Sequence, residues 1–325
     1  MERIGYFIVL SIFVIQSLLP VCSIFTSLII RREIIPGLKG FKVTVNGTSP
    51  GPIIRLITGQ IYQISVVNQL TDDATGVHWH GFSQFKTPFS DGVIGTTQCP
   101  ISNIAGSNTM IYEFNPSIAA TYFYHGHFHD QYPDGLIGAM VVTSDLEKQK
   151  LKALSVSYDY DIDEFVWLAA DYYEAPARSL LTSYYLTNQS GGNEPIPDGY
   201  LLNGKLSNSL TLLANRAASY RVRFVNAAAL SMFNISVDGM PLTIIEIDGN
   251  IVRPYEVSYF VTNVAQRVGF VLNFSRLAPS LQKSPAIWFR LTGIPSMYAT
   301  YNASLPNNGL YGKLIIYFIN NIVHF

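Results

Sequence analysis

The chain has 325 residues, enough for about two domains of ordinary size, each able to bury its own core. Its formal net charge is −1 and only 13% of its residues are charged, a balance that gives no electrostatic reason to expect a nucleic-acid partner. Aromatic residues make up another 13% and, with many valines, isoleucines and threonines, favour β-strands over helices.

The first thirty residues carry almost no charge. After Arg3 the next charged residue is Arg31, and Ile4–Leu19 is nearly all apolar and is followed by small residues. A basic start, an apolar centre and a small-residue exit are typical of a secretory signal peptide, so we predict one over residues 1–23 and a secreted, extracellular protein. The alternative is an uncleaved anchor that tethers the protein to a membrane, because the uncharged stretch 4–30 is long enough to cross a bilayer.

Two further features bear on this compartment. Five N-x-S/T sequons predict a glycoprotein, and they begin at Asn46, Asn188, Asn234, Asn273 and Asn302. The sequence has only two cysteines, and Cys22 is expected to leave with the signal peptide. Cys99 then remains as a lone cysteine in a secreted protein, which suggests that a partner for it lies elsewhere.

Beyond the leader, apolar and polar residues alternate in short segments separated by Gly, Pro, Asn and Asp, which predicts antiparallel strands and an all-β sandwich or barrel. The segments are 25–35, 53–67, 109–114, 121–124, 137–143, 220–225, 233–237 and 268–274. We expect no capped helix and a long loop over 187–199. A polar, then acidic and turn-rich stretch divides the mature chain at about residue 155, into domains over 24–155 and 156–312.

Only six histidines occur, and five of them lie in two clusters, each of which contains a His-x-His pair. His78 and His80 form the first pair, and His125 and His127 form the second, with His129 two residues further on. In a strand, side chains at i and i+2 point to one face, so each pair offers two imidazoles on the same side. Imidazole suits copper, zinc, iron or nickel. Two such pairs predict a metal site. The alternative is that core or surface histidines without a metal-binding role fall at this spacing by chance.

Two other scaffolds with His-x-His pairs fit this sequence less well. Cupin folds place a glutamate a few residues after the pair, and residues 81–85 contain none. A zinc site like that of carbonic anhydrase requires three histidines on neighbouring strands and surrounding motifs that are absent from this sequence.

Several motifs, in order and at matching spacings, resemble the first domain of multicopper oxidases, the family of laccases, ascorbate oxidases and fungal-type ferroxidases. They are Asn46–Pro52 (NGTSPGP), His78–Gly81 (HWHG), Asp91–Gly92, Thr97–Ile101 (TQCPI), Tyr122–His127 (YFYHGH) and Gln131–Gly138 (QYPDGLIG). Further segments are similar to the second domain of that family, namely 202–205 (LNGK), 220–226 (YRVRFVN), 242–249 (LTIIEIDG) and 266–267 (QR). The resemblance covers about residues 25–312.

The resemblance implies two tandem cupredoxin-like (plastocyanin-like) Greek-key domains and a trinuclear copper cluster between the first domain and a third. By position, His78 is similar to a ligand of the type 2 copper, and His80, His125 and His127 are similar to ligands of the type 3 pair. Such enzymes oxidise phenols, amines or metal ions by single electrons and reduce dioxygen to water, so their partners are dioxygen and a small reducing substrate.

Two nearby residues are compared with the family separately from these ligands. Asp91 falls where the family has a carboxylate that lies next to the ligands without binding the metal. Such a carboxylate orients the imidazoles or supplies protons. The alternative is a plain turn residue, because Asp-Gly is a common turn pair. His129 matches no family ligand and is predicted to lie at the rim of the site.

The sequence departs from the family where a third domain is expected. After His129 the next histidine is His324, and no cysteine follows Cys99, so the type 1 copper site and half of the cluster's histidines are absent. Cys99 itself resembles a cysteine bridged to that third domain, and the alternative is a simply buried free thiol. We therefore expect a chain truncated before the third domain, which would be the partner of its copper face.

The end of the sequence is unlike the family. Residues 313–325 are rich in Ile, Phe, Asn and Tyr, and we interpret them as an atypical tail or, alternatively, as a final strand. With only part of the copper ligands present, the alternative to an oxidoreductase is a non-catalytic secreted copper-binding fragment or an inactive truncated product.

Overall fold

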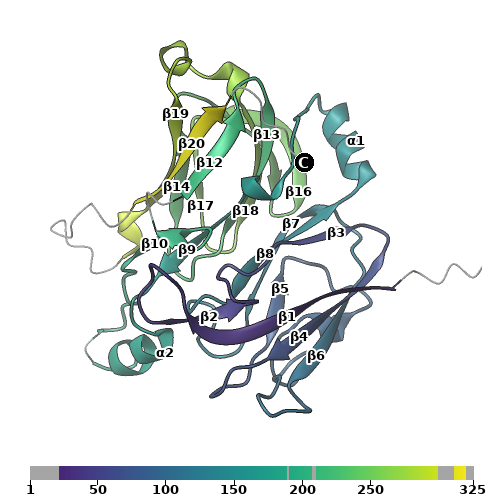
Figure 1. The fold of residues 1–325 in the computed structure, drawn as a ribbon, viewed down its shortest axis with the longest axis vertical. Helices are drawn as coiled ribbons and strands as arrows, with labels where there is room; N and C mark the ends of the chain where they lie inside the picture. Colours follow the sequence, from purple (N-terminus) through teal and green to yellow (C-terminus); the bar gives the residue numbers. More distant parts are fainter. Residues whose placement is uncertain (1–21, 189, 207–209, 299–310, 320–325) are drawn as a thin grey trace, which may run out of the picture.

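The computed structural model describes residues 22–188, 190–206, 210–298 and 311–319. The predicted all-β fold is confirmed, because strands arranged in four sheets make up most of the regular secondary structure of the described residues. Figure 1 shows β1, β2, β4, β5 and β6 in the lower part of the molecule and β12, β13, β14, β19 and β20 in the upper part, with β7, β8, β9 and β10 between them.

The first domain consists of two four-stranded sheets. One has the order β2-β1-β4-β6, with β1 (Cys22–Ile34), β2 (Phe41–Val45), β4 (Ile61–Asn68) and β6 (Thr109–Phe114). The other has the order β3-β8-β7-β5, with β3 (Ile54–Ile57), β5 (Val77–His80), β7 (Ala120–Gly126) and β8 (Ile137–Thr143). A buried apolar cluster that includes Trp79, Phe114 and Tyr124 lies between them. β1 contains the strand predicted over 25–35 except for its last residue. It also includes Cys22 and Ser23 of the expected leader, whose residues 1–21 lie outside the described residues.

The second domain consists of two larger sheets. One has the order β11-β10-β9-β13-β18-β15-β16, with β9 (Val166–Tyr172), β10 (Gly199–Leu202), β11 (Lys205–Leu206), β13 (Ser219–Asn226), β15 (Leu242–Ile247), β16 (Asn250–Val257) and β18 (Arg267–Asn273). The other has the order β12-β20-β19-β14-β17, with β12 (Leu210–Asn215), β14 (Phe233–Val237), β17 (Tyr259–Thr262), β19 (Ala286–Gly293) and β20 (Tyr311–Ile319). Trp167, Phe224 and Phe289 belong to the core between these sheets.

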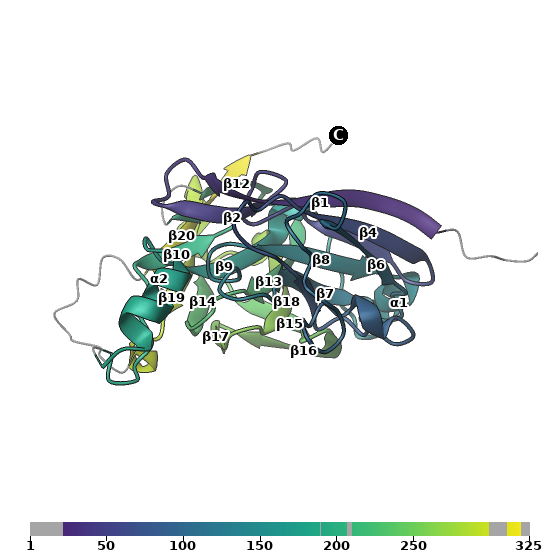
Figure 2. The same cartoon turned by 90° about the horizontal axis from the view of Figure 1, so that it is seen from below.

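The expectation of no capped helix was wrong. Helix α1 (Asp145–Ala153) begins after Ser144, whose hydroxyl accepts a hydrogen bond from the backbone N–H of Glu147. This Ser-x-x-Glu pattern is the ordinary signal for a helix N-terminus and was available in the sequence. A second short helix, α2 (Ala177–Leu180), continues into a π-helical turn (Leu181–Tyr185), and the two helices lie at opposite ends of the molecule (Figure 2).

Single 3-10 turns complete the secondary structure, and they are η1 (Pro88–Ser90), η2 (Asp163–Phe165), η4 (Phe274–Arg276), η5 (Pro279–Leu281) and η6 (Pro295–Met297). The predicted loop over 187–199 contains no helix and only its last residue, Gly199, belongs to a strand, within the part that the structure describes.

The residues interpreted as an atypical tail contribute a strand. β20 pairs in parallel with β12 and antiparallel with β19, so it lies inside the five-stranded sheet. Leu314 and Ile316 are completely buried there. The alternative of a final strand therefore describes residues 313–319, and residues 320–325 lie outside the described part.

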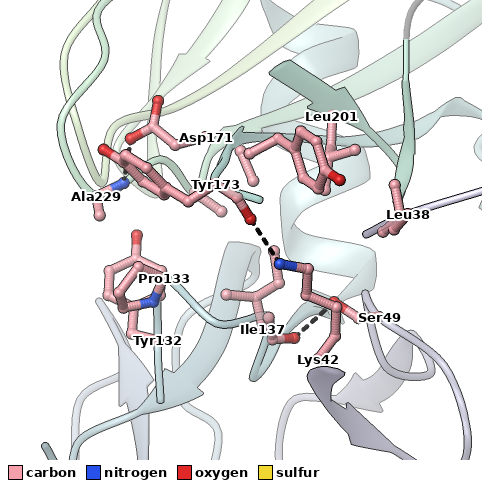
Figure 3. Close-up of a pocket in the computed structure, with 14 residues that line it drawn as sticks. Leu38, Lys42, Ser49, Tyr132, Pro133, Ile137, Asp171, Tyr173, Leu201 and Ala229 are labelled. Carbon is pink, nitrogen blue, oxygen red and sulfur yellow. Dashed lines mark hydrogen bonds between the residues drawn. The ribbon is translucent and has the colours of Figure 1, made fainter. Parts of the chain in front are cut away.

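The two domains meet along a buried apolar cluster to which both contribute. Phe123 and Val141 of the first domain pack with Leu168 and Val225 of the second. Beside this cluster a buried lysine, Lys42, donates a hydrogen bond of 2.7 Å across the interface to the backbone carbonyl of Tyr173, next to a cavity of about 20 Å³ (Figure 3). Apolar contact and buried polar bonds together fix how the domains are placed relative to each other.

Candidate metal centre

The two His-x-His pairs lie on adjacent antiparallel strands. β5 pairs with β7 in the register His78↔His125 and His80↔Phe123. Because side chains alternate along a strand, Trp79 points into the domain core, where it is fully buried, and both histidines of β5 point to the opposite face. The alternation that predicted two imidazoles on one side is confirmed for this strand.

Three of the four predicted residues converge. One ring nitrogen from each of His78, His80 and His125 lies within 4.8 Å of the other two. His127 follows the end of β7 and is exposed, and its ring centre lies 5.5 Å from that of His78 and 6.0 Å from that of His125. The tertiary structure thus gathers His78, His80 and His125 tightly, with His127 at their side.

Backbone carbonyls hold two of the rings in a defined tautomer. Nδ1 of His78 lies 2.7 Å from the carbonyl oxygen of Asp91, and Nδ1 of His125 lies 2.9 Å from that of Gly126. A carbonyl oxygen only accepts hydrogen bonds, so both rings carry their proton on Nδ1 and leave Nε2 unprotonated. His80 differs, because its Nδ1 faces Nε2 of His125 at 3.4 Å.

Burial keeps two of these imidazoles uncharged. It lowers the pKa of His125 to about 3, and it lowers the pKa of His80 to about 4 with a further contribution from the positive charge of Arg267. Both rings are therefore neutral near pH 7, which is the form that binds metal ions. Converging neutral imidazoles with free lone pairs fit copper, which takes nitrogen donors of this kind.

Asp91 contacts the site chiefly through its backbone. Its carbonyl oxygen makes the short contact with His78, whereas its carboxylate oxygen Oδ1 lies 3.5 Å from the same Nδ1. The residue also closes the η1 turn, with its N–H bonded to the carbonyl of Pro88. The hydrogen bond to Pro88 is consistent with Asp91 as a turn residue, and the approach of its carboxylate to His78 is consistent with Asp91 as a group that orients a ligand.

Aromatic residues that the sequence motifs did not single out support two of the rings. Phe123 stacks on His80 with ring centres 4.6 Å apart, and Tyr132 stacks on His125 at 4.4 Å. Tyr132 also donates its hydroxyl hydrogen bond to the carbonyl of Ala228 in the second domain. The alternation along β7 was a usable signal for Phe123, since it lies two residues before His125. Tyr132 lies within the Gln131–Gly138 motif, but the motif did not indicate a contact with His125.

His129 belongs to a separate cluster with Asp73 and Asp130. The guanidinium of Arg178 lies among them, at 3.1 Å from Asp73, 3.0 Å from Asp130 and 2.8 Å from Nδ1 of His129. A cation from α2 already neutralises these acids, so the cluster ties the first domain to α2.

Cys99 is exposed on the first domain and forms no disulfide with the described residues. The alternative of a buried thiol was therefore wrong, and a bridge to another domain stays a prediction. His324 lies outside the described residues.

Comparisons with known proteins agree with this fold. Two family models, both described as multicopper oxidase, match residues 34–147 and 163–280. Among curated relatives, Laccase-4 of Thanatephorus cucumeris is 34% identical over 251 residues, covering 73% of this chain and 45% of the relative. The laccase of Trametes maxima is 35% identical over 250 residues, covering 73% and 46%. The chain thus spans about half the length of the curated relatives it matches.

Solved structures show the same architecture. The multicopper oxidase Fet3p, which functions in iron import, superposes with a TM-score of 0.77 at 24% identity, covering 93% of this chain and 55% of that one. The laccase of Botrytis aclada superposes with a TM-score of 0.73 at 24% identity, covering 94% and 55%. With a multicopper oxidase model matched on each domain, laccases as sequence relatives and these folds as neighbours, the chain belongs to the multicopper oxidase family.

Proposed function

We propose that this chain forms one wall of the copper site of a laccase-like or ferroxidase-like oxidoreductase. The observation that carries the proposal is the convergence of His78, His80 and His125, with a ring nitrogen of each within 4.8 Å of the others. Two of these rings are bonded at Nδ1 to carbonyls and present Nε2 lone pairs to the shared space. Burial keeps His80 and His125 neutral near pH 7, so these two donors bind a copper ion without first losing protons.

In this proposal His78 is a ligand of the type 2 copper, and His80, His125 and His127 are ligands of the type 3 pair. Copper in such a site supplies one-electron chemistry that couples oxidation of a small reducing substrate, a phenol, an amine or a metal ion, to reduction of dioxygen to water. The contribution of the protein is to fix the imidazoles, through the Asp91 and Gly126 carbonyls and the stacked rings of Phe123 and Tyr132.

Asp91 has a second role in the proposal. Its side chain is 29% exposed and its Oδ1 lies 3.5 Å from Nδ1 of His78, so the carboxylate joins the histidine cluster to solvent. In this position the carboxylate would orient the ligand imidazole or relay protons between solvent and the site.

We propose that the remaining copper ligands come from a third domain that packs on this histidine face. Among the described residues, the only other histidine is His129, and Arg178 engages it. The exposed thiol of Cys99 is available for the disulfide with that domain that the family resemblance implies.

We also infer that the protein is secreted and carries N-linked glycans. The leader predicted over residues 1–23 supports this. Among the described residues, no helix is long and apolar enough to cross a membrane. Asn46 and Asn188 are exposed and accessible to modification. Asn234 lies in β14 between two neighbouring strands, with its side-chain oxygen buried, and we expect this sequon to stay unmodified.

Copper uptake by the chain tests the proposal. The purified protein is dialysed against copper, and the bound metal is counted by mass spectrometry. We expect uptake in the unaltered chain and its loss in the double variant His78→Ala, His127→Ala. His129→Ala is the matched control, because it removes an imidazole outside the converging set, and it should bind as much copper as the unaltered chain. Uptake that survives the double change would refute the ligand assignment.

A further inference from the structure

We propose that Arg267, a residue of the second domain, is a positioning residue for the histidine site of the first. It holds together the ends of the two strands that carry His80 and His125. This inference rests on the proposed copper function and adds to it a role for a domain that contributes no ligand of its own.

Arg267 begins β18 and is buried, with 6% of its surface exposed. Its own domain fixes the guanidinium, because Nη1 donates hydrogen bonds of 3.1 Å to the Asp248 carboxylate and to the carbonyl of Ala265. From there Nε reaches across the interface and donates to the carbonyl of Thr121 at 3.2 Å. Thr121 lies on β7, four residues before His125.

The same guanidinium packs against the other metal-bearing strand. A methyl group placed on Gly81 would lie 2.3 Å from Nη2 of Arg267 and 2.9 Å from Cζ, closer than non-bonded atoms approach. Gly81 follows His80 directly and has a φ of +81°, which favours glycine. One planar side chain thus touches the backbone next to His80 and the backbone of β7.

This contact matters because β5 is weakly supported by its own sheet. It has four residues and is an edge strand that pairs, among the described strands, with β7. The ring of His80 stacks on Phe123 of β7, and its Nδ1 faces Nε2 of His125 at 3.4 Å. A small shift of the β5 end along β7 would change that distance, so whatever abuts Gly81 sets the mutual position of the two imidazoles.

Two other residues of the second domain bond to β7 at Thr121. Glu246 accepts the backbone N–H of Thr121 at 2.7 Å, and Nη1 of Arg223 donates to its hydroxyl at 3.1 Å. Arg223 is therefore a matched control, a buried arginine at the same interface whose side chain does not abut Gly81. Loss of either arginine should destabilise the protein, and only the loss of Arg267 should disturb the metal site.

The experiment compares the unaltered chain with Arg267→Gln, Arg267→Lys and Arg223→Gln. Copper affinity is measured by competition with a chelator, the nitrogen donor set by electron paramagnetic resonance of bound Cu(II), and the melting temperature of the metal-free protein separately. We expect Arg267→Gln to weaken copper binding by about 10- to 100-fold and to alter the resonance spectrum. Arg267→Lys should recover little, because an ammonium lacks the planar fork. Arg223→Gln should lower the melting temperature while affinity and spectrum stay as in the unaltered chain.

A double-mutant cycle tests the contact itself. Gly81→Ala should weaken copper binding in the unaltered background, through backbone strain and the clash with Arg267. In the Arg267→Gln background the clash is relieved, so the added effect of Gly81→Ala should be smaller, and the difference isolates the contact.

Unchanged affinity and spectrum in Arg267→Gln would overturn the positioning role and leave the copper function standing, as would full additivity in the cycle. Absence of histidine-dependent copper uptake in the unaltered chain would overturn both proposals.

Discussion

The carbonyl oxygen of Asp91 lies 2.7 Å from Nδ1 of His78, closer than the carboxylate of the same residue, whose Oδ1 lies at 3.5 Å. The ligand is therefore oriented mainly by the backbone of a loop. The next residue, Gly92, makes the loop possible, with a φ of +87° and no space for a side chain against the carbonyl of Val77. The orientation of His78 then depends more on the glycine than on the carboxylate.

Asp91→Asn should leave copper affinity within about threefold of the unaltered chain, because the backbone contact with His78 is retained. Loss of the group that orients a ligand would instead lower metal affinity by about 10- to 100-fold. If Asp91 also handles protons, the complete enzyme carrying Asp91→Asn should lose turnover at unchanged copper content. A large loss of copper affinity would instead show that the carboxylate holds His78.

Gly92→Ala should be far more damaging than the change at Asp91. A methyl group at this position would lie 1.8 Å from the carbonyl oxygen of Val77, so the loop must move away from β5 and take the Asp91 carbonyl with it. We expect copper affinity to fall by at least about 10-fold. Gly95→Ala is the control, because Gly95 also has a positive φ but has open space around it. Equal copper affinities in the two variants would contradict this role of the loop.

The interface should also be sensitive to acid through Glu246. This carboxylate is buried and accepts a hydrogen bond of 2.6 Å from Arg221. Burial raises the pKa of Glu246, but Arg221 and Arg223 outweigh it, so the pKa lies below the ordinary value of 4.5. The stability that Glu246 contributes is therefore present above pH 4.5 and is lost as the pH falls through the lower folded value.

Glu246→Gln should lower the free energy of unfolding by about 1.5–3 kcal/mol at pH 7, because it removes one of the two buried carboxylates that Arg221 bonds and leaves only Glu147, at 2.7 Å. The difference from the unaltered chain should shrink as the pH falls below 4.5, where the carboxyl group of the unfolded chain becomes protonated, and should be smallest below the lower folded pKa, where the native carboxylate is protonated too. Urea unfolding at several pH values measures this. Glu256→Gln is the control, because its ion pair with Arg276 is exposed, and it should cost less than about 1 kcal/mol. A pH-independent difference for Glu246→Gln would contradict a lowered pKa for this carboxylate.

The C-terminal strand gives a prediction about stability alone. Ile316 is fully buried in β20, whereas the neighbouring Tyr317 is 40% exposed. Ile316→Ala should lower the free energy of unfolding by about 2–5 kcal/mol, as for other buried aliphatic residues, and Tyr317→Ala should cost much less. Denaturant unfolding of the two variants compares them directly. Similar small effects would mean that residues after 312 do not belong to the core of the second domain.

Local patterns in the sequence predicted much of the fold. Alternation located strands such as β6, β8 and β14 at their observed bounds, because the side-chain period of two is a property of each strand by itself. Helix α1 was missed although its capping signal was present, since it is short and lies in a polar linker. The strand character of residues 313–319 was left open, because a short apolar run is typical of a tail as well as of a buried strand. Only the pairing of β20 with its two neighbours in the sheet decided it.

The sequence by itself determined the candidate metal ligands. These are two pairs of imidazoles, each placed on one side of a strand, within motifs of a copper-dependent family. The tertiary structure decided which groups meet. Register placed His78 opposite His125, a loop brought the Asp91 carbonyl to His78, and Arg267 reached Thr121 from 146 residues away in the sequence. Contacts between residues so far apart in the sequence produce no periodic pattern of residue types. They depend on how the sheets of the two domains pack and not on the spacing of neighbouring residues.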